Sequence, residues 1–248
     1  MSSASRPTPD AKHHRIAVVG AGCAGSSLAV EFAARGIDAD VTLFDPAEPA
    51  ADRTWCFWET TPHRFADAIT KRWPRVTVRG GGTESTIDVG DTPYACVRAS
   101  DFHRLAAEAI DASGCTVRRG VSVEAIRETD TGVELDLASH GATLGTEKFD
   151  FVFDGRPQRK LDAANESEPT LLQHFGGIEL AVPAGTLDTS VATLMDFDVP
   201  QHDGAHFMYA LPFASDRVLV ESTFLTPKVG RGIDYEANAM TYAREVLG

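Results

Sequence analysis

Three glycines and one aspartate near the start of the chain have the types and spacing of a dinucleotide-binding site. Gly20, Gly22 and Gly25 form the pattern G-x-G-x-x-G, and Asp45 follows twenty residues after the third glycine. In this pattern the first glycine permits a tight turn, the second lets the backbone approach a pyrophosphate, and the third lets a helix pack closely on a strand. The carboxylate is placed to accept a hydrogen bond from a ribose 2′-hydroxyl, which favours FAD or NAD over NADP. The motif alone does not separate FAD from NAD.

The segments around these residues supply the context that gives the pattern its meaning. Apolar residues 16–19 predict a buried strand that ends at Gly20, and a helical pattern begins after Gly25. Residues 41–44 predict a second strand, which ends at Asp45. The N-terminus of the helix offers free N–H groups and a partial positive charge to a phosphate. A glycine-rich turn without a ligand is the alternative, and the strand, the helix and the acid together favour the binding site.

A second carboxylate follows another apolar segment. Residues 149–153 predict a buried strand, and Asp154 and Gly155 come directly after it. An isolated Asp-Gly pair indicates only a turn. After an apolar strand, however, it indicates a carboxylate at the edge of the sheet where ligands bind. Asp154 is therefore a second candidate cofactor contact.

An aromatic cluster follows the second predicted strand. Trp55, Phe57 and Trp58 lie within the segment DRTWCFW (52–58), which fits no clean helix or strand period. Because strand ends in a dinucleotide fold face the ligand crevice, these rings are candidates for lining an apolar pocket or stabilising a cation. The alternative is a local hydrophobic plug.

A glutamate in the last predicted strand is the candidate for acid chemistry. The period of two over residues 217–224 places Leu219, Glu221 and Thr223 on one face. Both faces are mostly apolar, so Glu221 is a carboxyl among apolar neighbours. Burial raises the pKa of a carboxyl, and such a group can donate a proton near neutral pH. The alternative is a structural ion pair between Glu221 and an arginine.

The remaining patterns predict an α/β chain with two domains. We expect a disordered tail over 1–14, a nucleotide-binding domain over 15–160 with an inserted β-hairpin at about 75–98, and an antiparallel β domain for the substrate over 161–248. Helices are predicted over 62–74, 101–112 and 235–247, the second capped by Ser100 and ended by Gly114. Strands of the second domain are predicted at 171–182, 190–197, 206–213 and 217–224.

The composition is that of a globular protein with an acidic surface. Of the 248 residues 43% are apolar and 24% charged, and the net charge is −13. The acidic balance argues against nucleic acid as a main partner. No apolar run approaches the ~18 residues of a membrane span. The four cysteines have neither metal-site spacing nor the pattern of a disulfide framework, so we expect reduced thiols, no metal and a cytoplasmic location.

Four blocks resemble the FAD-dependent lycopene cyclases of carotenoid biosynthesis. They are VVGAGCAGSSLA (18–29), DRTWCFW (52–58), LLQHFGGIEL (171–180) followed by TLMDF (193–197), and FMYALPFASDRVLVEST (207–223). The first block belongs to the whole two-dinucleotide-binding flavoprotein superfamily, whereas the second and third are more specific. The resemblance covers about residues 15–247. It implies a Rossmann-like FAD domain in which Arg98 lies in the segment that contacts the flavin, and FVFDGRP (151–157) is the second nucleotide-contact strand.

This resemblance implies a non-redox reaction that uses reduced FAD, with NAD(P)H as the reductant. The family closes the acyclic ψ ends of lycopene into β-ionone rings, giving γ-carotene and then β-carotene. An acid protonates the terminal C1=C2 double bond, the C5=C6 double bond attacks the cation, and loss of a proton from C6 completes the ring. Glu221 matches the acidic position of the family motif and is the candidate acid. The aromatic residues of 52–58 would stabilise the cation, and a carotenoid substrate implies peripheral membrane contact.

Family members continue past the end of this chain into a region resembling G-x-x-G-Y, which contacts the flavin. We therefore expect an N-terminal portion with incomplete FAD binding. Position 222 is serine where the plant-like motif has a second acid. Two other functions stay open. One is a redox enzyme on the same scaffold, a flavin monooxygenase or a polyprenyl reductase. The other is an inactive truncated flavoprotein.

Overall fold

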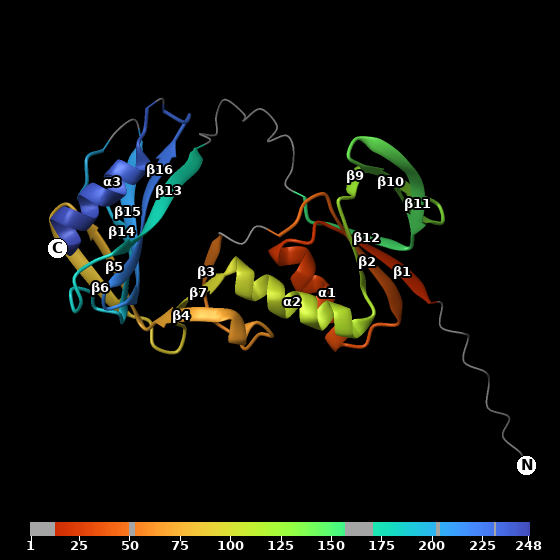
Figure 1. The fold of residues 1–248 in the computed structure, drawn as a ribbon, viewed down its shortest axis with the longest axis horizontal. Helices are drawn as coiled ribbons and strands as arrows, with labels where there is room; N and C mark the ends of the chain where they lie inside the picture. Colours follow the sequence, from red (N-terminus) through yellow and green to blue (C-terminus); the bar gives the residue numbers. More distant parts are fainter. Residues whose placement is uncertain (1–12, 50–52, 157–170, 202–203, 231) are drawn as a thin grey trace, which may run out of the picture. The chain divides into compact units, whose positions relative to one another are not determined.

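The computed structural model describes residues 13–49, 53–156, 171–201, 204–230 and 232–248. They form two compact units (Figure 1). The first unit contains the chain up to Arg53 together with residues 98–159, and the second contains residues 54–97 and the chain from Lys160 onward. Most of the predicted tail and the predicted domain junction at 161–170 lie outside the described residues. Within the tail, His14 already belongs to the first strand.

The first unit is organised around a four-stranded parallel sheet, as the α/β class predicts. Its order is β12 (Phe151–Asp154), β1 (His14–Val19), β2 (Ala39–Asp45) and β8 (Thr116–Arg119). Parallel pairing brings the ends of neighbouring strands level, so that Val19 lies between Phe44 and Asp154. The predicted nucleotide-binding residues therefore gather at one edge of this sheet.

Two helices and a second sheet cover this parallel sheet. α1 (Cys23–Ala34) packs against β1, β2 and α2 (Ala99–Ser113). α2 ends at Gly114, as predicted, with a left-handed φ of 81°. It begins one residue before the predicted cap, so Ser100 lies inside the helix and Arg98 occupies the cap.

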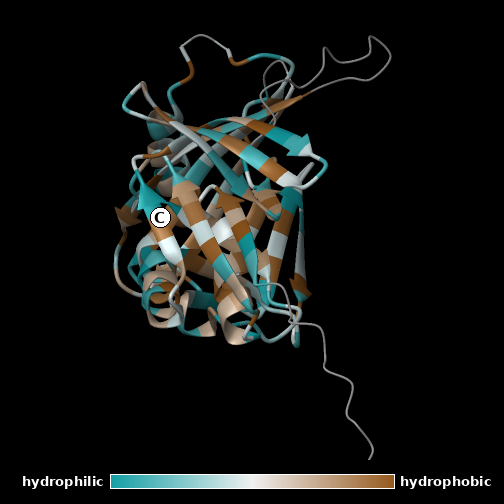
Figure 2. Cartoon of the chain, turned by 90° about the vertical axis from the view of Figure 1, so that its right-hand side faces the viewer, coloured by the Kyte–Doolittle hydropathy of each residue, from teal (hydrophilic) through white to brown (hydrophobic). Residues whose placement is uncertain are grey.

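The second sheet of this unit is antiparallel and contains β9 (Ser122–Thr129), β10 (Gly132–Ser139) and β11 (Ala142–Phe149). One apolar cluster joins it to the parallel sheet; its buried members are Ala17, Val19, Phe44, Val121, Val123, Leu135, Leu137 and Phe149. Figure 2 shows the alternating apolar and polar bands along strands that bury one face.

The prediction of one buried strand over 149–153 is wrong. Phe149 ends β11, and β12 starts at Phe151. Phe151 and Phe153 are 51% and 42% exposed. β12 lies at the sheet edge with one neighbouring strand, so these rings receive less cover than the apolar sequence suggests.

The second unit contains a six-stranded sheet that is antiparallel except for one pair. Its order is β13 (Leu172–Ala181), β16 (Arg217–Thr226), β15 (Ala205–Ala214), β14 (Val191–Asp196), β5 (Arg75–Gly80) and β6 (Thr83–Asp88). The four predicted strands of the second domain are present. β5 and β6 form the predicted hairpin, but β5 pairs in parallel with β14. This hairpin therefore extends the sheet of the second unit instead of being an insertion in the nucleotide-binding domain.

The second unit also contains a small three-stranded sheet, which includes residues predicted to form a helix. Its order is β3 (Thr54–Trp58), β7 (Tyr94–Arg98) and β4 (Ile69–Trp73). The helix predicted over 62–74 is only a short 3₁₀ turn (Ala66–Ala68) followed by β4. Antiparallel pairing with β7 and full burial of Trp73, whose indole N–H donates to the carbonyl of Pro212 at 3.1 Å, outweigh the local helical pattern.

One face of the six-stranded sheet packs against the last helix, α3 (Tyr235–Tyr242), which continues as a π-helical turn (Ala243–Leu247). The helix and the sheet share an apolar cluster, and its buried members are Met208, Ala210, Val218, Val220, Ala239 and Tyr242. In the part of the chain that the structure describes, no helix is long and apolar enough to cross a membrane.

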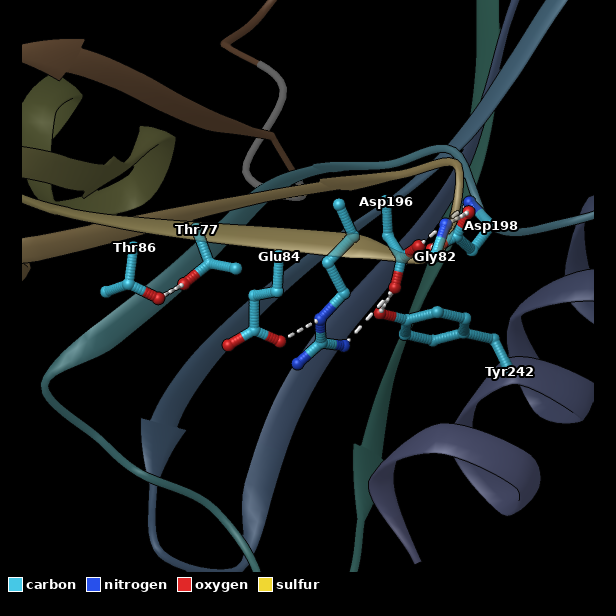
Figure 3. A network of polar contacts seen from close by, with 8 residues as sticks. Thr77, Gly82, Glu84, Thr86, Asp196, Asp198 and Tyr242 are labelled. Atoms are coloured by element: carbon cyan, nitrogen blue, oxygen red, sulfur yellow. Dashed lines mark hydrogen bonds and ion pairs between the residues drawn. The ribbon is translucent and has the colours of Figure 1, made fainter.

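A buried carboxylate joins this helix to the sheet. The side chain of Asp196, at the end of β14, is 3% exposed and accepts a hydrogen bond from the Tyr242 hydroxyl at 2.8 Å (Figure 3). The Arg79 guanidinium lies 3.3 Å from the same carboxylate and also pairs with the exposed Glu84 at 2.6 Å. The carboxylate of Asp196 thus connects β14 with α3 and with the β5–β6 hairpin.

We predict that Asp196→Ala lowers the free energy of unfolding by about 3 kcal/mol, because it leaves a buried hydroxyl and a partly buried cation without their acceptor. Urea denaturation followed by circular dichroism measures this. Glu84→Ala is the matched control, since it removes the exposed partner of the same guanidinium and should cost less than about 1 kcal/mol. Equal losses would contradict the role given to Asp196.

Candidate functional site

The glycine turn of the first unit has the geometry that the sequence predicts. Gly20 has a φ of 94°, a conformation that favours glycine, and its N–H donates to the carbonyl of Phe44 at 2.8 Å. A Cβ atom at Gly25 would lie 1.8 Å from the carbonyl oxygen of Gly20. Gly25 therefore lets α1 start directly against the turn. A Cβ atom at Gly22 would meet nothing within 4 Å, so open space lies above it.

Asp45 holds the backbone of this turn. One carboxylate oxygen accepts from the N–H of Ala21 at 2.8 Å, and the other accepts from the N–H of Ala47 at 2.9 Å. Arg119, which the parallel register places beside Asp45, lies 3.7 Å from the first oxygen. The sequence analysis missed Arg119, and only the pairing of β2 with β8 could have identified it.

These features fit a dinucleotide. α1 begins at Cys23 with Gly22 as its N-cap and no side-chain cap on its N–H groups, and the space above Gly22 is open. A pyrophosphate at this helix end would receive backbone N–H donors and the favourable end of the helix dipole. The carboxylate of Asp45 stands at the end of the neighbouring strand, where a ribose hydroxyl would reach it.

Asp154 and Arg98 both lie at the ends of strands. Asp154 ends β12 beside Val19, but both its oxygens accept from the Arg156 guanidinium at 2.8 Å. That pairing holds the pKa of Asp154 below its usual value. Arg98 ends β7 and caps α2. The predicted roles of Asp154 and Arg98 toward a cofactor remain predictions.

Glu221 lies in β16, on the face of the six-stranded sheet opposite α3. Cross-strand pairing places Tyr209 of β15 on one side of it and Gly177 of β13 on the other. Among the residues that the structure describes, neither an arginine nor any other side chain forms an ion pair or hydrogen bond with this carboxyl. Burial raises the pKa of Glu221 above its usual value. The described residues therefore do not form the ion pair that was the structural alternative for Glu221, and its role as an acid remains a prediction.

Two phenols, Tyr94 and Tyr209, and two thiols, Cys56 and Cys96, belong to an apolar cluster that also contains Leu219 of β16. The hydroxyls of Tyr94 and Tyr209 lie 2.8 Å apart, and burial raises the pKa of Tyr94 to about 12 and raises that of Tyr209 as well. Cys56 of β3 is close enough to Glu221 for its charge to oppose ionisation of the thiol. A hydrogen bond with Cys96 outweighs this effect and burial, so the pKa of Cys56 is lowered.

The predicted aromatic residues of β3 pack against different neighbours. Trp58 packs against Tyr94 with ring centroids 4.9 Å apart, and Cys56 joins the same apolar cluster. Phe57 instead packs against His63 at 5.4 Å, and Trp55 is half-buried. Trp58 thus contacts Tyr94, whose hydroxyl lies beside that of Tyr209, and is itself 42% exposed. The sequence analysis missed Tyr94, Tyr209 and Cys56, although the alternation of β15 could have indicated Tyr209.

Comparison with known proteins assigns the family. A family model described as "Lycopene cyclase protein" matches residues 15–248. The chain belongs to the lycopene cyclase family. The chain is 27% identical to a lycopene beta-cyclase from Pantoea ananas over 85% of its length, and 29% identical to one from Paracoccus sp. (strain N81106 / MBIC 01143) over 94%. It spans 52% and 57% of the lengths of these relatives.

The fold of this chain also occurs in solved structures of proteins with other activities. A structure of the halogenase PltM matches 94% of this chain with a TM-score of 0.62 at 12% identity, and this chain covers 56% of it. A geranylgeranyl bacteriochlorophyll reductase-like protein from Thermoplasma acidophilum matches 93% with a TM-score of 0.61 at 12% identity, and 60% of it is covered. At such identities the likeness shows the fold alone.

The two parts of the candidate site differ in chemistry. The first unit of this lycopene cyclase family member offers a backbone turn and a carboxylate for a dinucleotide. The second unit offers one carboxyl with a raised pKa among phenols, thiols and aromatic rings. No group of three or more potential metal ligands occurs in the described ranges. Of these two parts, only the second could carry acid chemistry on an apolar compound.

We predict that Gly25→Ala lowers the free energy of unfolding by about 3 kcal/mol or more, because the new methyl group collides with a backbone oxygen that cannot move away. Gly22→Ala is the matched control in the same turn and should change stability by less than about 1 kcal/mol, since its methyl group enters open space. Thermal unfolding of both variants measures the difference. Equal stability of the two variants would refute the close approach at Gly25.

We also predict a pH-dependent effect of Glu221→Gln. The folded chain holds the Glu221 proton more tightly than the unfolded chain does, so this residue makes folding less favourable as the pH rises. The variant should therefore gain stability relative to the wild type from pH 4.5, the ordinary carboxyl value, upward. Urea denaturation between about pH 4 and 8 measures this.

Glu179→Gln serves as the control for this titration. Glu179 lies on the same sheet face, where its register partner is Leu219, and it pairs with Arg217 at 3.1 Å. Removing an ion-paired carboxylate should not make the variant progressively more stable as the pH rises. If both variants follow the same trend, the effect does not come from the burial of Glu221.

Proposed function

We propose that this protein is a lycopene β-cyclase in which Glu221 is the acid. The substrate is lycopene or a similar acyclic carotenoid, and the products are γ-carotene and β-carotene. The observation that carries the proposal is a carboxyl with a raised pKa, free of ion pairs within the described residues, in a chain of the lycopene cyclase family. Because the chain spans about half the length of its curated relatives, activity of this polypeptide is part of the proposal.

Protonation of a carbon–carbon double bond needs an acid that keeps its proton near neutral pH. A carboxyl in apolar surroundings meets this requirement, because its ionised form has lost its hydration. Glu221 transfers the proton to C1=C2 of the ψ end, and a tertiary cation forms. The C5=C6 double bond attacks this cation, and loss of the C6 proton yields the β-ionone ring. No net oxidation or reduction occurs.

The aromatic side chains beside Glu221 protect the cation. Trp58 and Tyr94 present rings whose electron-rich faces attract a positive charge. Trp73 is fully buried in the same cluster, and its centroid lies 6.3 Å from that of Tyr94. The buried Trp73 would help to exclude water, which would otherwise add to the cation and give an alcohol, whereas Trp58 is 42% exposed. Trp55 and Phe57 lie in the same strand, but Phe57 packs in another direction, against His63.

The residues of the first unit fit FAD. We propose that the N-terminus of α1 holds its pyrophosphate above Gly22, and that Asp45 binds its adenosine ribose, with Gly20 and Gly25 shaping the turn. When bound and reduced by NAD(P)H, FAD supplies a negative charge that stabilises a passing cation. Because carotenoids dissolve in lipid, we also propose a cytoplasmic protein in peripheral contact with the membrane.

Expression in a bacterium that accumulates lycopene tests the proposal. We expect β-carotene or γ-carotene in the pigment extract, identified by chromatography and absorption spectra. If lycopene persists, the chain is extended with the remaining length of the Paracoccus relative and tested again. Conversion by the extended chain alone locates the missing activity in that extension, and persistence of lycopene with both chains refutes the function.

In the active form, Glu221→Gln should lower cyclisation by about 10³-fold or more, since a general acid contributes on the order of 10²–10⁴. Flavin absorbance should be retained. Glu179→Gln is the control and should keep cyclisation within a few-fold. Loss of both flavin and activity in Glu221→Gln would assign Glu221 a structural role.

A further inference from the structure

Two adjacent glycines of β13 occupy positions where neighbouring side chains need the space. A Cβ atom at Gly176 would lie 2.7 Å from the Cβ atom of Tyr235, on the face that carries α3. A Cβ atom at Gly177 would lie 2.4 Å from the Cγ atom of Glu221, on the opposite face. Neither glycine has the positive φ that would by itself favour glycine. Both positions therefore require glycine because neighbouring side chains occupy the space, and not because of the backbone conformation.

The strand pairing explains why Glu221 needs this space. Glu221 lies directly between Tyr209 of β15 and Gly177 of β13, and β13 is the edge strand of the sheet. On the β15 side, Tyr209 is the register partner of Glu221, and both Tyr209 and Leu219 pack against the apolar cluster that contains Trp73. On the other side, the Cγ atom of Glu221 lies over the bare backbone of Gly177.

We propose that Gly177 positions the carboxyl of Glu221 by leaving free the space above β13 that the glutamate side chain occupies. This rests on the proposed role of Glu221 as the acid. A methyl group at position 177 would displace the Cγ atom. Since Tyr209 and Leu219 occupy the inner side, the displaced carboxyl moves toward solvent and away from the aromatic cluster. Gly177 thereby keeps the acid in its buried place without touching a substrate.

A double-mutant cycle on this chain tests the contact directly. Gly177→Ala should lower stability in urea denaturation, and at least half of this loss should disappear in the Glu221→Ala background, where the colliding Cγ atom is absent. Gly176→Ala is the matched control. It also collides, but with Tyr235 on the other face, so its loss should be the same in both backgrounds.

The titration midpoint of Glu221 reports whether its carboxyl has moved toward solvent. With ¹³C-labelled glutamate, the Glu221 signal is assigned by its absence in Glu221→Gln. Its midpoint should fall by more than about half a pH unit in Gly177→Ala, since exposure relieves the burial that raises it. It should stay unchanged in Gly176→Ala. A merely structural role of Gly177 would leave the midpoint in place.

These measurements test the positioning of Glu221 by Gly177 independently of the proposed cyclase activity. Coupling between positions 177 and 221 with a lowered midpoint supports it, even if no lycopene is converted by any form of the chain. Absence of coupling, or an unchanged or raised midpoint, overturns it, even if the wild type is an active cyclase. If Gly177→Ala does not fold, recovery of folding in Gly177→Ala/Glu221→Ala supports the contact, and failure of both overturns it.

Discussion

Burial of the Glu221 carboxyl is the constraint on which the chemistry of the second unit depends. Burial disfavours the ionised form of a carboxyl that has neither a cation nor donors beside it, and none is present for Glu221 among the described residues. The pKa of Glu221 is therefore raised above its usual value. Tyr209 on one side, Gly177 on the other and the aromatic cluster around Trp73 together keep the carboxyl in this environment.

The contrast with Asp196 shows that burial alone does not decide what a carboxyl does. Asp196 is more deeply buried than Glu221, yet it accepts from Tyr242 and pairs with Arg79. Its lone pairs are used to fasten α3 and the β5–β6 hairpin to the sheet. Glu221 lies on the other face of the same sheet without such partners. One carboxyl therefore supports the fold, while the other has the raised pKa on which the proposed acid role rests.

Close approach at glycine is the second physical theme, and it recurs in both units. At Gly25 a helix starts against the backbone of Gly20, and at Gly177 a side chain lies on the backbone of an edge strand. The first approach shapes a place for a nucleotide, and the second leaves room for an acid. Halogenases and a reductase-like protein share this scaffold. The groups in the second unit, and not the scaffold, therefore distinguish the chemistry proposed for this family member.

The sequence by itself determined the glycine turn, the sheet face of Glu221 and the four strands predicted from residue 171 onward. These features are local: the glycine spacing fixes a turn, and period-two alternation fixes which residues share a strand face. The sequence did not determine the course of residues 62–74, because pairing of β4 with β7 and burial of Trp73 outweigh local propensity. Only the tertiary structure joined the β5–β6 hairpin to β14, and only it brought Tyr94 to Tyr209 and Cys56 close to Glu221. Those contacts connect segments more than a hundred residues apart, and strand register, which no local pattern encodes, decides them.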